Sequence, residues 1–412
     1  MLRFLVAVLF AFVYCSHATA AQVTIATWNL GWHMDQATVQ QWISECSKTY
    51  LEDASGKWNP STTAGSVPGW DVDNTFDIVG WDTTRFPVCD VYRAGKTVRV
   101  TLEAYRKRQQ EISGFIERSL QADILAFQEV SSTQAVREAL PNGGVDYDFC
   151  EVTGYKVQRL VITWKKTLGQ KISCEIEDPL SLPANPDEKR RPRPGLALTL
   201  DIDGKLLRVM TVHLKSSCVS PFEDRGNLAG GGDHCPILQQ QVDPIESWIE
   251  RESADGAKLV LLGDFNRNLW HELRDQRPVR TDGSGPATAR PADVLTLSLV
   301  EEVSDSAPAS STMRILDENC KTNEVGQVLC TISEMRILEP AETTLLATPS
   351  YLGCRNPVGL DHILVGPGVQ SDGPAEHVSI GKFGGNKLGD QQGVGQVLSI
   401  SDHCPMIAKL NF

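Results

Sequence analysis

Polar residues suited to metal or proton chemistry stand at the ends of several apolar segments of this chain. The clearest case is Lys258-Leu-Val-Leu-Leu-Gly-Asp-Phe-Asn266, in which an apolar run leads to Asp264 and Asn266. A run this short, bounded by polar residues, predicts a strand that is buried on both faces. Residues two apart in an extended chain point the same way, so Asp264 and Asn266 would project together. On its own, the motif is equally well explained as a strand followed by an Asp/Asn turn.

The same arrangement recurs along the chain, which favours a single site assembled at one edge of a sheet. The predicted strands end at these polar residues: Asn29, Glu129, His213, Asp264 with Asn266, and Asp402 with His403. Most of these groups offer carboxylate or amide oxygens, which suit a hard cation such as Mg²⁺ or Mn²⁺ better than zinc. Histidines beside carboxylates suit general acid–base catalysis near neutral pH. The set therefore favours metal-assisted attack of water on a phosphate ester.

The elements that must position these residues are short apolar strands and two amphipathic helices. β-branched and apolar runs predict strands, and apolar residues three and four apart predict helices. The predicted strands cover residues 21–30, 123–130, 154–166, 196–200, 206–214, 259–263, 360–365 and 406–412, and the predicted helices cover 103–120 and 237–249.

Two long stretches, at about 33–103 and 275–345, break the regular pattern and are predicted to be insertions. The first holds four tryptophans among Gly, Pro and Asp turns, together with Cys46 and Cys89. It is too long for the connection within one βαβ unit, which has roughly thirty residues in all. We expect its tryptophans to form a local core, although they are also suited to form a ligand platform.

The composition is that of a globular chain with an acidic surface. The 412 residues are enough for one large domain or two ordinary ones, and 41% are hydrophobic. The net charge of −13 repels polyanions at long range, so a phosphate-bearing substrate needs a metal ion or a local basic patch. The one concentrated basic stretch is Lys189-Arg-Arg-Pro-Arg193, for which solvated surface is the simpler explanation.

Residues 1–20 have the pattern of a secretory signal peptide. Arg3 precedes an apolar run from Phe4 to Tyr14, and Ala18-Thr-Ala20 matches a cleavage site. The run is too short to span a bilayer, so we expect cleavage before Ala21 and a secreted protein, extracellular or periplasmic. We predict no stable membrane association and a monomer. Since residues 1–20 contain one arginine and no acid, the mature net charge would be −14.

Ten cysteines remain after Cys15 is removed, an even number in an oxidising compartment. We interpret them as disulfides rather than metal ligands, because no C-x₂-C spacing occurs. Connectivity cannot be deduced, but proximity along the chain favours Cys218–Cys235 and Cys320–Cys330.

Taken together, the motifs resemble those of the endonuclease/exonuclease/phosphatase superfamily, the deoxyribonuclease-I-like fold. The matching pieces span nearly all of residues 21–412 in the family's order: Thr27-Trp-Asn29, Ala126-Phe-Gln-Glu-Val130, Thr211-Val-His-Leu-Lys215, Leu262-Gly-Asp-Phe-Asn266, Leu360-Asp-His-Ile-Leu364 and Ser401-Asp-His403. The resemblance implies an α/β fold, a four-layer α/β/β/α sandwich, formed by a single domain with the two insertions. The site would lie at one edge of the two packed sheets.

The resemblance also implies a role for each motif residue. Glu129 would be the main metal ligand, assisted by Asn29 and Asp402. His403, oriented by Asp361, would be the general base or would stabilise the phosphate. These further roles are implied: water activation or leaving-group assistance for Asp264, phosphate orientation for Asn266, proton or hydrogen-bond donation for His213, and phosphate binding for Arg193, with Arg191 as its competitor.

Three functions remain open on this reading. The first is a secreted, divalent-metal-dependent phosphodiesterase, with nuclease action on nucleic acid as the preferred form. The second is a sphingomyelinase, another phospholipase-C-like enzyme or a phosphomonoesterase, because the site residues are shared among these activities. The third is a non-catalytic binding module. Every key position holds a chemically competent residue, which argues against this third function.

We predict that the mature, oxidised protein has no free thiol, because its ten cysteines would form structural disulfides. Each such disulfide is typically worth about 2–4 kcal/mol. Thiol titration of the denatured but unreduced protein measures this directly. Two or more reactive thiols per chain would contradict the pairing.

Overall fold

The computed structural model describes most of the chain between Ala21 and Phe412. The described residues are 21–92, 98–154, 158–186, 191–221, 234–269, 272, 298–304, 308–316, 352–356, 359–381 and 397–412, together with the backbone of 320–322 and 328–330. The predicted signal peptide, residues 1–20, lies outside them.

Two mixed sheets form the centre of the molecule. The first has the order β16-β18-β1-β5-β7-β6, with β17 also paired to β18, and the second has the order β12-β15-β11-β10-β9-β8. The first sheet consists of β16 (Gln370–Ser371), β18 (Met406–Asn411), β1 (Gln22–His33), β5 (Ile124–Val130), β7 (Arg159–Lys165), β6 (Tyr147–Glu151) and β17 (Glu376–His377). The second consists of β12 (Arg314–Ile315), β15 (Asp361–Val365), β11 (Lys258–Asp264), β10 (Lys205–His213), β9 (Gly195–Ile202) and β8 (Gln170–Glu177).

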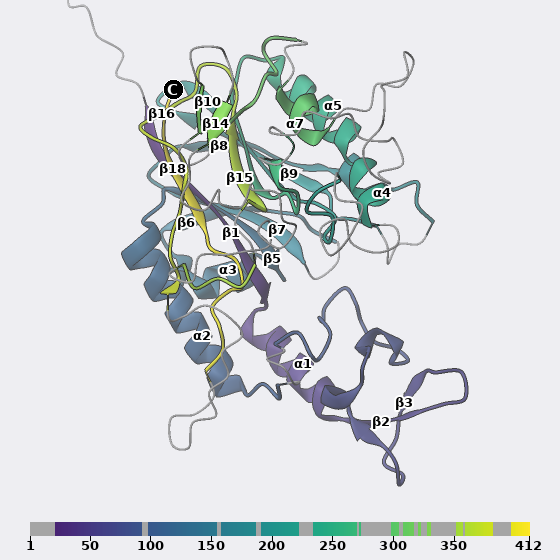
Figure 1. The fold of residues 1–412 in the computed structure, drawn as a ribbon. Helices are drawn as coiled ribbons and strands as arrows, with labels where there is room; N and C mark the ends of the chain where they lie inside the picture. The colour runs from purple at the N-terminus through teal and green to yellow at the C-terminus, as the bar shows by residue number, and fades with distance from the viewer. Residues whose placement is uncertain are drawn as a thin grey trace, which may run out of the picture.

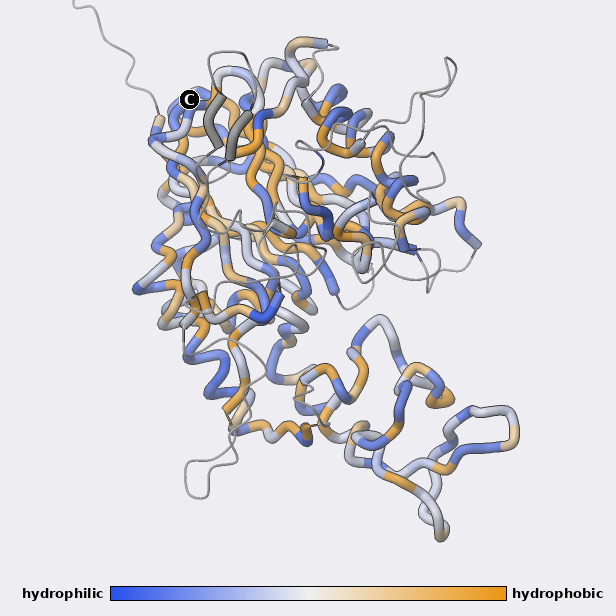
Figure 2. Tube along the Cα trace, in the orientation of Figure 1, coloured by the Kyte–Doolittle hydropathy of each residue, from blue (hydrophilic) through white to orange (hydrophobic). Residues whose placement is uncertain are grey.

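Helices cover the outer face of each sheet, so the predicted four-layer α/β/β/α sandwich is confirmed (Figure 1). α2 (Leu102–Phe115) and α3 (Thr133–Ala139) pack on the first sheet. α4 (His234–Gln239), α5 (Val242–Ser253) and α7 (Leu299–Ser304) pack on the second. Figure 2 shows hydrophobic segments concentrated in the strands between these layers.

Side-chain alternation along the strands explains the continuous apolar runs. In β11, Val260 and Leu262 lie in the core between the sheets, whereas Leu259 and Leu261 pack beneath the helices of the second sheet. Both faces of the strand are buried, so an unbroken apolar run is required. Asp264 continues the series of Val260 and Leu262, and therefore projects from the inter-sheet face.

Two predicted helices differ from the prediction at one point each. Residues 103–120 form α2 and then a single π-helical segment, Ile116–Leu120. Residues 237–249 fall in two helices, α4 and α5, rather than one. Pro244 explains this break, because it lies in the first turn of α5, where a missing N–H costs no helical hydrogen bond.

The first predicted insertion forms a lobe that extends from the end of β1 (Figure 1). It contains α1 (Gln36–Ser47), capped by Asp35, and a small sheet of β2 (Thr49–Glu52), β3 (Trp58–Pro60) and β4 (Val67–Pro68). Trp42 and Trp70 are buried in edge-to-face contact with ring centroids 5.3 Å apart. These two tryptophans thus belong to the predicted local core.

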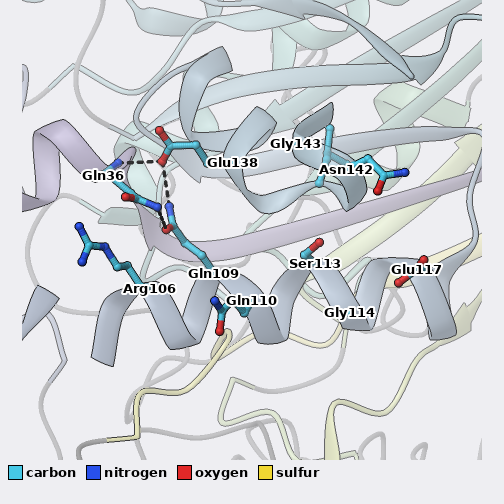
Figure 3. Close-up of a pocket in the computed structure, with 11 residues that line it drawn as sticks. Gln36, Arg106, Gln109, Gln110, Ser113, Gly114, Glu117, Glu138, Asn142 and Gly143 are labelled. Carbon is cyan, nitrogen blue, oxygen red and sulfur yellow. Dashed lines mark hydrogen bonds between the residues drawn. The ribbon is translucent and has the colours of Figure 1, made fainter. Parts of the chain in front are cut away.

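A polar junction attaches this lobe to the outer helices of the sandwich (Figure 3). The Glu138 carboxylate on α3 accepts from the Gln36 backbone N–H at 2.8 Å and from Gln109 Nε2 on α2 at 3.0 Å. An open hollow of about 440 Å³ lies here, lined by polar groups of α2 and α3. None of the predicted site residues lines it, so it is a structural junction rather than the candidate site.

Parts of the second predicted insertion, residues 275–345, belong to the sandwich. α7 packs in the outer core of the second sheet, and β12 pairs with β15 at its edge. Much of the remaining range lies outside the described residues. Within the described residues, no helix has the length and apolar character needed to cross a bilayer.

Four disulfides are present among the described residues: Cys46–Cys89, Cys150–Cys174, Cys218–Cys235 and Cys354–Cys404. The predicted Cys218–Cys235 pair is therefore confirmed. Cys320 and Cys330 are opposite each other in the backbone register of β13 (Cys320–Thr322) and β14 (Val328–Cys330), but their side chains lie outside the described residues.

Gly263, next to the candidate site residue Asp264, has a conformation that predicts a sharp effect of substitution. Its φ is +140°, and a Cβ there would lie 2.2 Å from the Val212 carbonyl oxygen on β10. We expect Gly263→Ala to lower the free energy of unfolding by about 1–3 kcal/mol, the usual cost of overpacking. Urea denaturation measures the change.

Gly373→Ala is the matched control, because Gly373 is exposed and a Cβ there would meet nothing within 4 Å. Equal stability changes in the two variants would show that the close approach of β10 and β11 is not a constraint.

Candidate active site

The register of three neighbouring strands brings three predicted site residues together. β10 and β11 run parallel with His213 opposite Asp264, and β15 runs antiparallel with Asp361 opposite Asp264. Asp361 is the first residue of β15 and the other two are the last residues of their strands. Hydrogen-bonded strands are about 4.8 Å apart, so these side chains must share one edge of the sheet.

Asn29 joins this group from the opposite sheet. It follows Val23 and Ile25 in the alternation of β1, so it also faces the inter-sheet space. Its Nδ2 donates to Asp264 Oδ2 at 2.9 Å, and its Oδ1 accepts from the Gly31 N–H at 3.0 Å. Asn29 therefore ties the two sheets together at the site.

Glu129 enters the site because β5 breaks its alternation. Ile124 and Ala126 face the inter-sheet core, so a regular strand would point Glu129 to the opposite face. Instead, Glu129 has a φ of 57°, and the pairing of β5 with both of its neighbours shifts register near it. Left-handed backbone at a non-glycine residue costs roughly 1–3 kcal/mol and clusters at functional sites.

His403 is held between carboxylates. Its Nδ1 lies 2.8 Å from Asp361 Oδ2, and its Nε2 lies 3.8 Å from Asp264 Oδ2. Burial alone would lower the pKa of His403, but the charges of Asp361, Asp264 and Asp402 outweigh it and hold that pKa well above its usual value. These charges therefore favour the protonated, imidazolium form of His403.

His213 is the electrostatic opposite of His403. Its Nε2 lies 3.6 Å from both Glu129 Oε1 and Asp264 Oδ2. Burial, followed by the positive charges of Arg193 and His403, lowers the pKa of His213 well below its usual value. The neutral ring has one N–H to donate, and the nearby carboxylates favour placing that proton on Nε2.

Asp264 is the carboxylate common to these contacts. Burial, assisted by the charge of Asp361, raises the pKa of Asp264 to about 7 against the attraction of His403. Its Oδ1 also accepts from the Asn266 backbone N–H at 2.8 Å. A carboxyl group with this pKa is balanced between accepting and releasing a proton at neutral pH.

Asn266 and the two candidate arginines take different positions. Asn266 Nδ2 donates to the Leu214 carbonyl at 3.2 Å, so its amide supports the loop after β10. Arg193 acts electrostatically on both Glu129 and His213, which places its charge at the site. Arg191 Nε instead donates to the Asn185 carbonyl at 2.6 Å.

Glu129 and Asp402 face a common cavity of about 120 Å³, which His403 also lines. Burial, followed by the charge of Asp402, raises the pKa of Glu129. Burial opposes ionisation of Asp402, but His403 and Arg355 outweigh it and leave the pKa of Asp402 below its usual value. Gly31 borders the same cavity, and a Cβ there would lie 2.8 Å from Asp402 Oδ1.

The residues around this cavity fit a hard divalent cation. Glu129 and Asp402 supply carboxylate oxygens, and the Asn29 amide oxygen lies beside the cavity, bonded to the backbone N–H of Gly31, which lines it. Crowding of the two carboxylates is relieved by a bound cation. Within the described residues, Asp264, Asp361 and His403 also have ligand-type atoms within 4.8 Å of one another. Both groups are therefore candidate cation sites.

Several residues around the site were not predicted from the sequence. Arg355, Asn356 and Tyr92 line the cavity, and Gln158 bonds to Glu129. Tyr92 comes from the first insertion, so the lobe contributes directly to the cavity. No sequence signal identifies Arg355 and Asn356, because only the structure shows that their neighbour Cys354 is joined to Cys404, the residue after His403.

Comparison with known proteins gives low-identity structural matches. D. rerio TDP2 complexed with single-strand DNA product is 14% identical with a TM-score of 0.43, covering 95% of this chain and 100% of that chain. ANGEL2, a 2′,3′-cyclic phosphatase in complex with adenosine-2′,3′-vanadate, is 16% identical with a TM-score of 0.46, covering 95% and 96%. The human Nocturnin catalytic domain with bound sulfate is 13% identical with a TM-score of 0.40, covering 74% and 86%. No curated protein sequence matches the chain significantly.

Family membership rests on the sequence itself. The profile of the Endonuclease/Exonuclease/phosphatase family matches residues 91–403, more than half of the chain. The matched range contains every predicted site residue except Asn29. Members of this family are hydrolases that act on phosphoric esters, and they are typically dependent on divalent metals. This chain therefore belongs to the endonuclease/exonuclease/phosphatase family.

Proposed function

We propose that this chain is an exported, divalent-metal-dependent phosphodiesterase that hydrolyses nucleic acid. The observation that carries the proposal is the joint arrangement of His213, Asp264, Asp361 and His403 beside the cavity of Glu129 and Asp402. Two histidines whose pKa values are shifted in opposite directions flank one carboxylate whose pKa is raised to about 7. This arrangement can move a proton and stabilise phosphate charge at the same place.

Glu129, Asp402 and Asn29 would hold the cation. When bound, it would neutralise negative charge on the phosphate and on the surrounding carboxylates. The cation is also what allows a chain of net charge −13 to accept an anionic substrate.

Asp264 is the best-placed general base for the attacking water. Its pKa of about 7 lies near the operating pH, where a base combines ionisation with useful proton affinity. Asn29 and the Asn266 backbone N–H fix both of its oxygens, so the carboxylate is already oriented.

His403 and His213 would stabilise the phosphate rather than share the base role. An imidazolium held by Asp361 can donate a charge-assisted hydrogen bond from Nε2 to a phosphate oxygen that takes the place of the Asn356 amide. The neutral His213 can donate one from its own Nε2. Arg193 would add a positive charge on the side of Glu129 and His213, whereas the phosphate-orienting role predicted for Asn266 stays a prediction.

Export and the choice of nucleic acid rest on separate observations. The pattern of residues 1–20 supports export, as do the four disulfides, which are typical of oxidising compartments. Cationic Arg193 and Arg355 at an otherwise acidic site support a substrate rich in phosphate. A lipid phosphodiester or a phosphomonoester is the alternative that the substrate test must separate.

The substrate test uses purified mature protein with plasmid DNA, RNA, sphingomyelin and an aryl phosphodiester, each with and without Mg²⁺. We expect hydrolysis of nucleic acid and of the aryl diester only when the cation is present. Faster hydrolysis of sphingomyelin than of either nucleic acid would replace the proposed substrate. Full activity in excess EDTA would remove the metal from the proposal.

Replacement of the main predicted ligand, in Glu129→Gln or Glu129→Ala, should cripple activity while preserving the fold. We expect a loss of at least about 10–100-fold, the range found even for outer partners of metal ligands. Thermal unfolding provides an independent measurement, because a ligand at 100 times its Kd stabilises a protein by about 2.7 kcal/mol. Mg²⁺ should raise the Tm of the wild type and not that of Glu129→Gln; equal shifts would place the cation elsewhere.

The tetrapeptide Asp-His-Cys-Pro occurs twice, at 233–236 and 402–405, and provides a matched pair of variants. His403→Ala should lower turnover by roughly 10²–10³-fold, the usual cost of removing one donor that stabilises charge in the transition state. His234 begins α4, its Nδ1 lies 2.6 Å from Lys215 Nζ, and it does not line the cavity of Glu129 and Asp402. His234→Ala should therefore lower turnover far less. Both variants are measured on one phosphodiester after circular dichroism; an inactive His234→Ala beside an active His403→Ala would overturn the assignment.

A further inference from the structure

A short segment, Leu352–Asn356, is fastened to the loop that carries Asp402 and His403. The Cys354–Cys404 disulfide joins the two segments covalently. The backbone N–H groups of Arg355 and Asn356 both donate to the Asp402 carbonyl, at 3.0 and 2.8 Å. Because three bonds fix so short a segment, the side chains of Arg355 and Asn356 are held in place at the site.

The two side chains lie at different depths. The Asn356 side-chain amide lies 2.7 Å from His403 Nε2, where its oxygen can accept from a protonated ring, and that ring is only 5% exposed. Arg355 Nη2 is 2.6 Å from Asp402 Oδ2, but its side chain is 57% exposed. Asn356 therefore faces the reacting group, whereas Arg355 lies at the mouth of the same cavity.

Arg355 has hydrogen-bonding capacity to spare. A guanidinium presents five N–H donors in a planar fork that matches phosphate geometry. Among the described residues, the Arg355 guanidinium bonds to Asp402 alone, through Nη2. The other donors face solvent at the cavity mouth, where a second anionic group of a bound substrate can reach them.

We propose that Arg355 is a specificity residue that binds a phosphate next to the scissile one, so that the site favours a strand of linked phosphodiesters over a substrate with a single phosphate. The inference rests on the proposed phosphodiesterase function and adds the substrate class. A lone phosphate at His403 leaves no second anion for Arg355. A nucleic-acid strand supplies one along the chain direction.

The test compares Arg355→Ala and Arg355→Lys with the wild type on two substrates, a single-stranded oligonucleotide and an aryl phosphodiester with one phosphate. Arg99→Ala is the matched control, because Arg99 also donates Nη2 to an aspartate, Asp71, at 2.8 Å and its side chain is 63% exposed. We expect Arg355→Ala to raise KM for the oligonucleotide by roughly 10- to 100-fold more than KM for the aryl diester. Arg355→Lys, which keeps the charge but loses the fork, should lie between, and Arg99→Ala should match the wild type.

A binding measurement separates this proposal from the proposed function. Binding of a non-hydrolysable phosphorothioate oligonucleotide is followed by fluorescence anisotropy at several salt concentrations. Loss of one phosphate contact to a single strand should reduce the slope of log K against log [salt] by about 0.7. Arg355→Ala should show that reduction and Arg99→Ala should not.

Two outcomes overturn the proposal. Equal losses on both substrates would mean that Arg355 acts only through Asp402, as a positioning residue. An unchanged salt slope would mean that Arg355 contacts no phosphate of the strand. A wild type that hydrolyses neither substrate is a failure of the proposed function, and the salt slope then still decides whether Arg355 binds the strand.

Discussion

The register of β10, β11 and β15 is the constraint on which the site depends. It places His213, Asp264 and Asp361 side by side at one edge of the second sheet. The first sheet adds Asn29 across the inter-sheet space through its bond to Asp264. A shift of one residue in any of these strands would turn a polar strand end toward the outer helices, because alternate side chains face opposite sides of a sheet. The apolar core on both faces of the strands prevents that shift, so the packing of the sandwich is also what aligns the chemistry.

Charge crowding is the second physical theme of the site. Glu129, Asp264 and Asp402 lie where burial penalises ionisation, and Asp361 lies next to Asp264. The structure offsets this crowding in three ways. The proton favoured on His403 places a positive charge beside the carboxylates, and the exposed Arg355 forms an ion pair with Asp402. The cavity lined by Glu129 and Asp402 also fits a cation. The two histidines are driven in opposite directions by the same neighbours, since His403 is closest to carboxylates and His213 is close to Arg193 and His403. The same group of charges thus favours a protonated ring at His403 and a neutral ring at His213.

Features beyond the regular pairing of the strands complete the site. The left-handed backbone of Glu129 overrides the strand alternation, and a disulfide fastens Arg355 and Asn356 beside Asp402. The inserted lobe contributes Tyr92 to the cavity lining, and its attachment through Glu138 keeps it against α2 and α3. An irregular strand residue, a disulfide-linked segment and the inserted lobe therefore all contribute to the lining of the cavity.

The sequence by itself determined the strands with two buried faces and the residues at their ends, and the preference for a hard cation stays a prediction from it. Short apolar runs such as residues 259–263 encode these strands locally, since burial on both faces requires apolar residues at every position. Strand β8 was not predicted because it is an exposed edge strand whose side chains lack a clear apolar pattern. Strand β6 was not predicted either. Only the tertiary structure decided how Glu129 reaches the site, which charge state each histidine takes, and that Cys354 pairs with Cys404. These properties depend on groups far apart in the chain, whose distances and burial are fixed only when the two sheets pack.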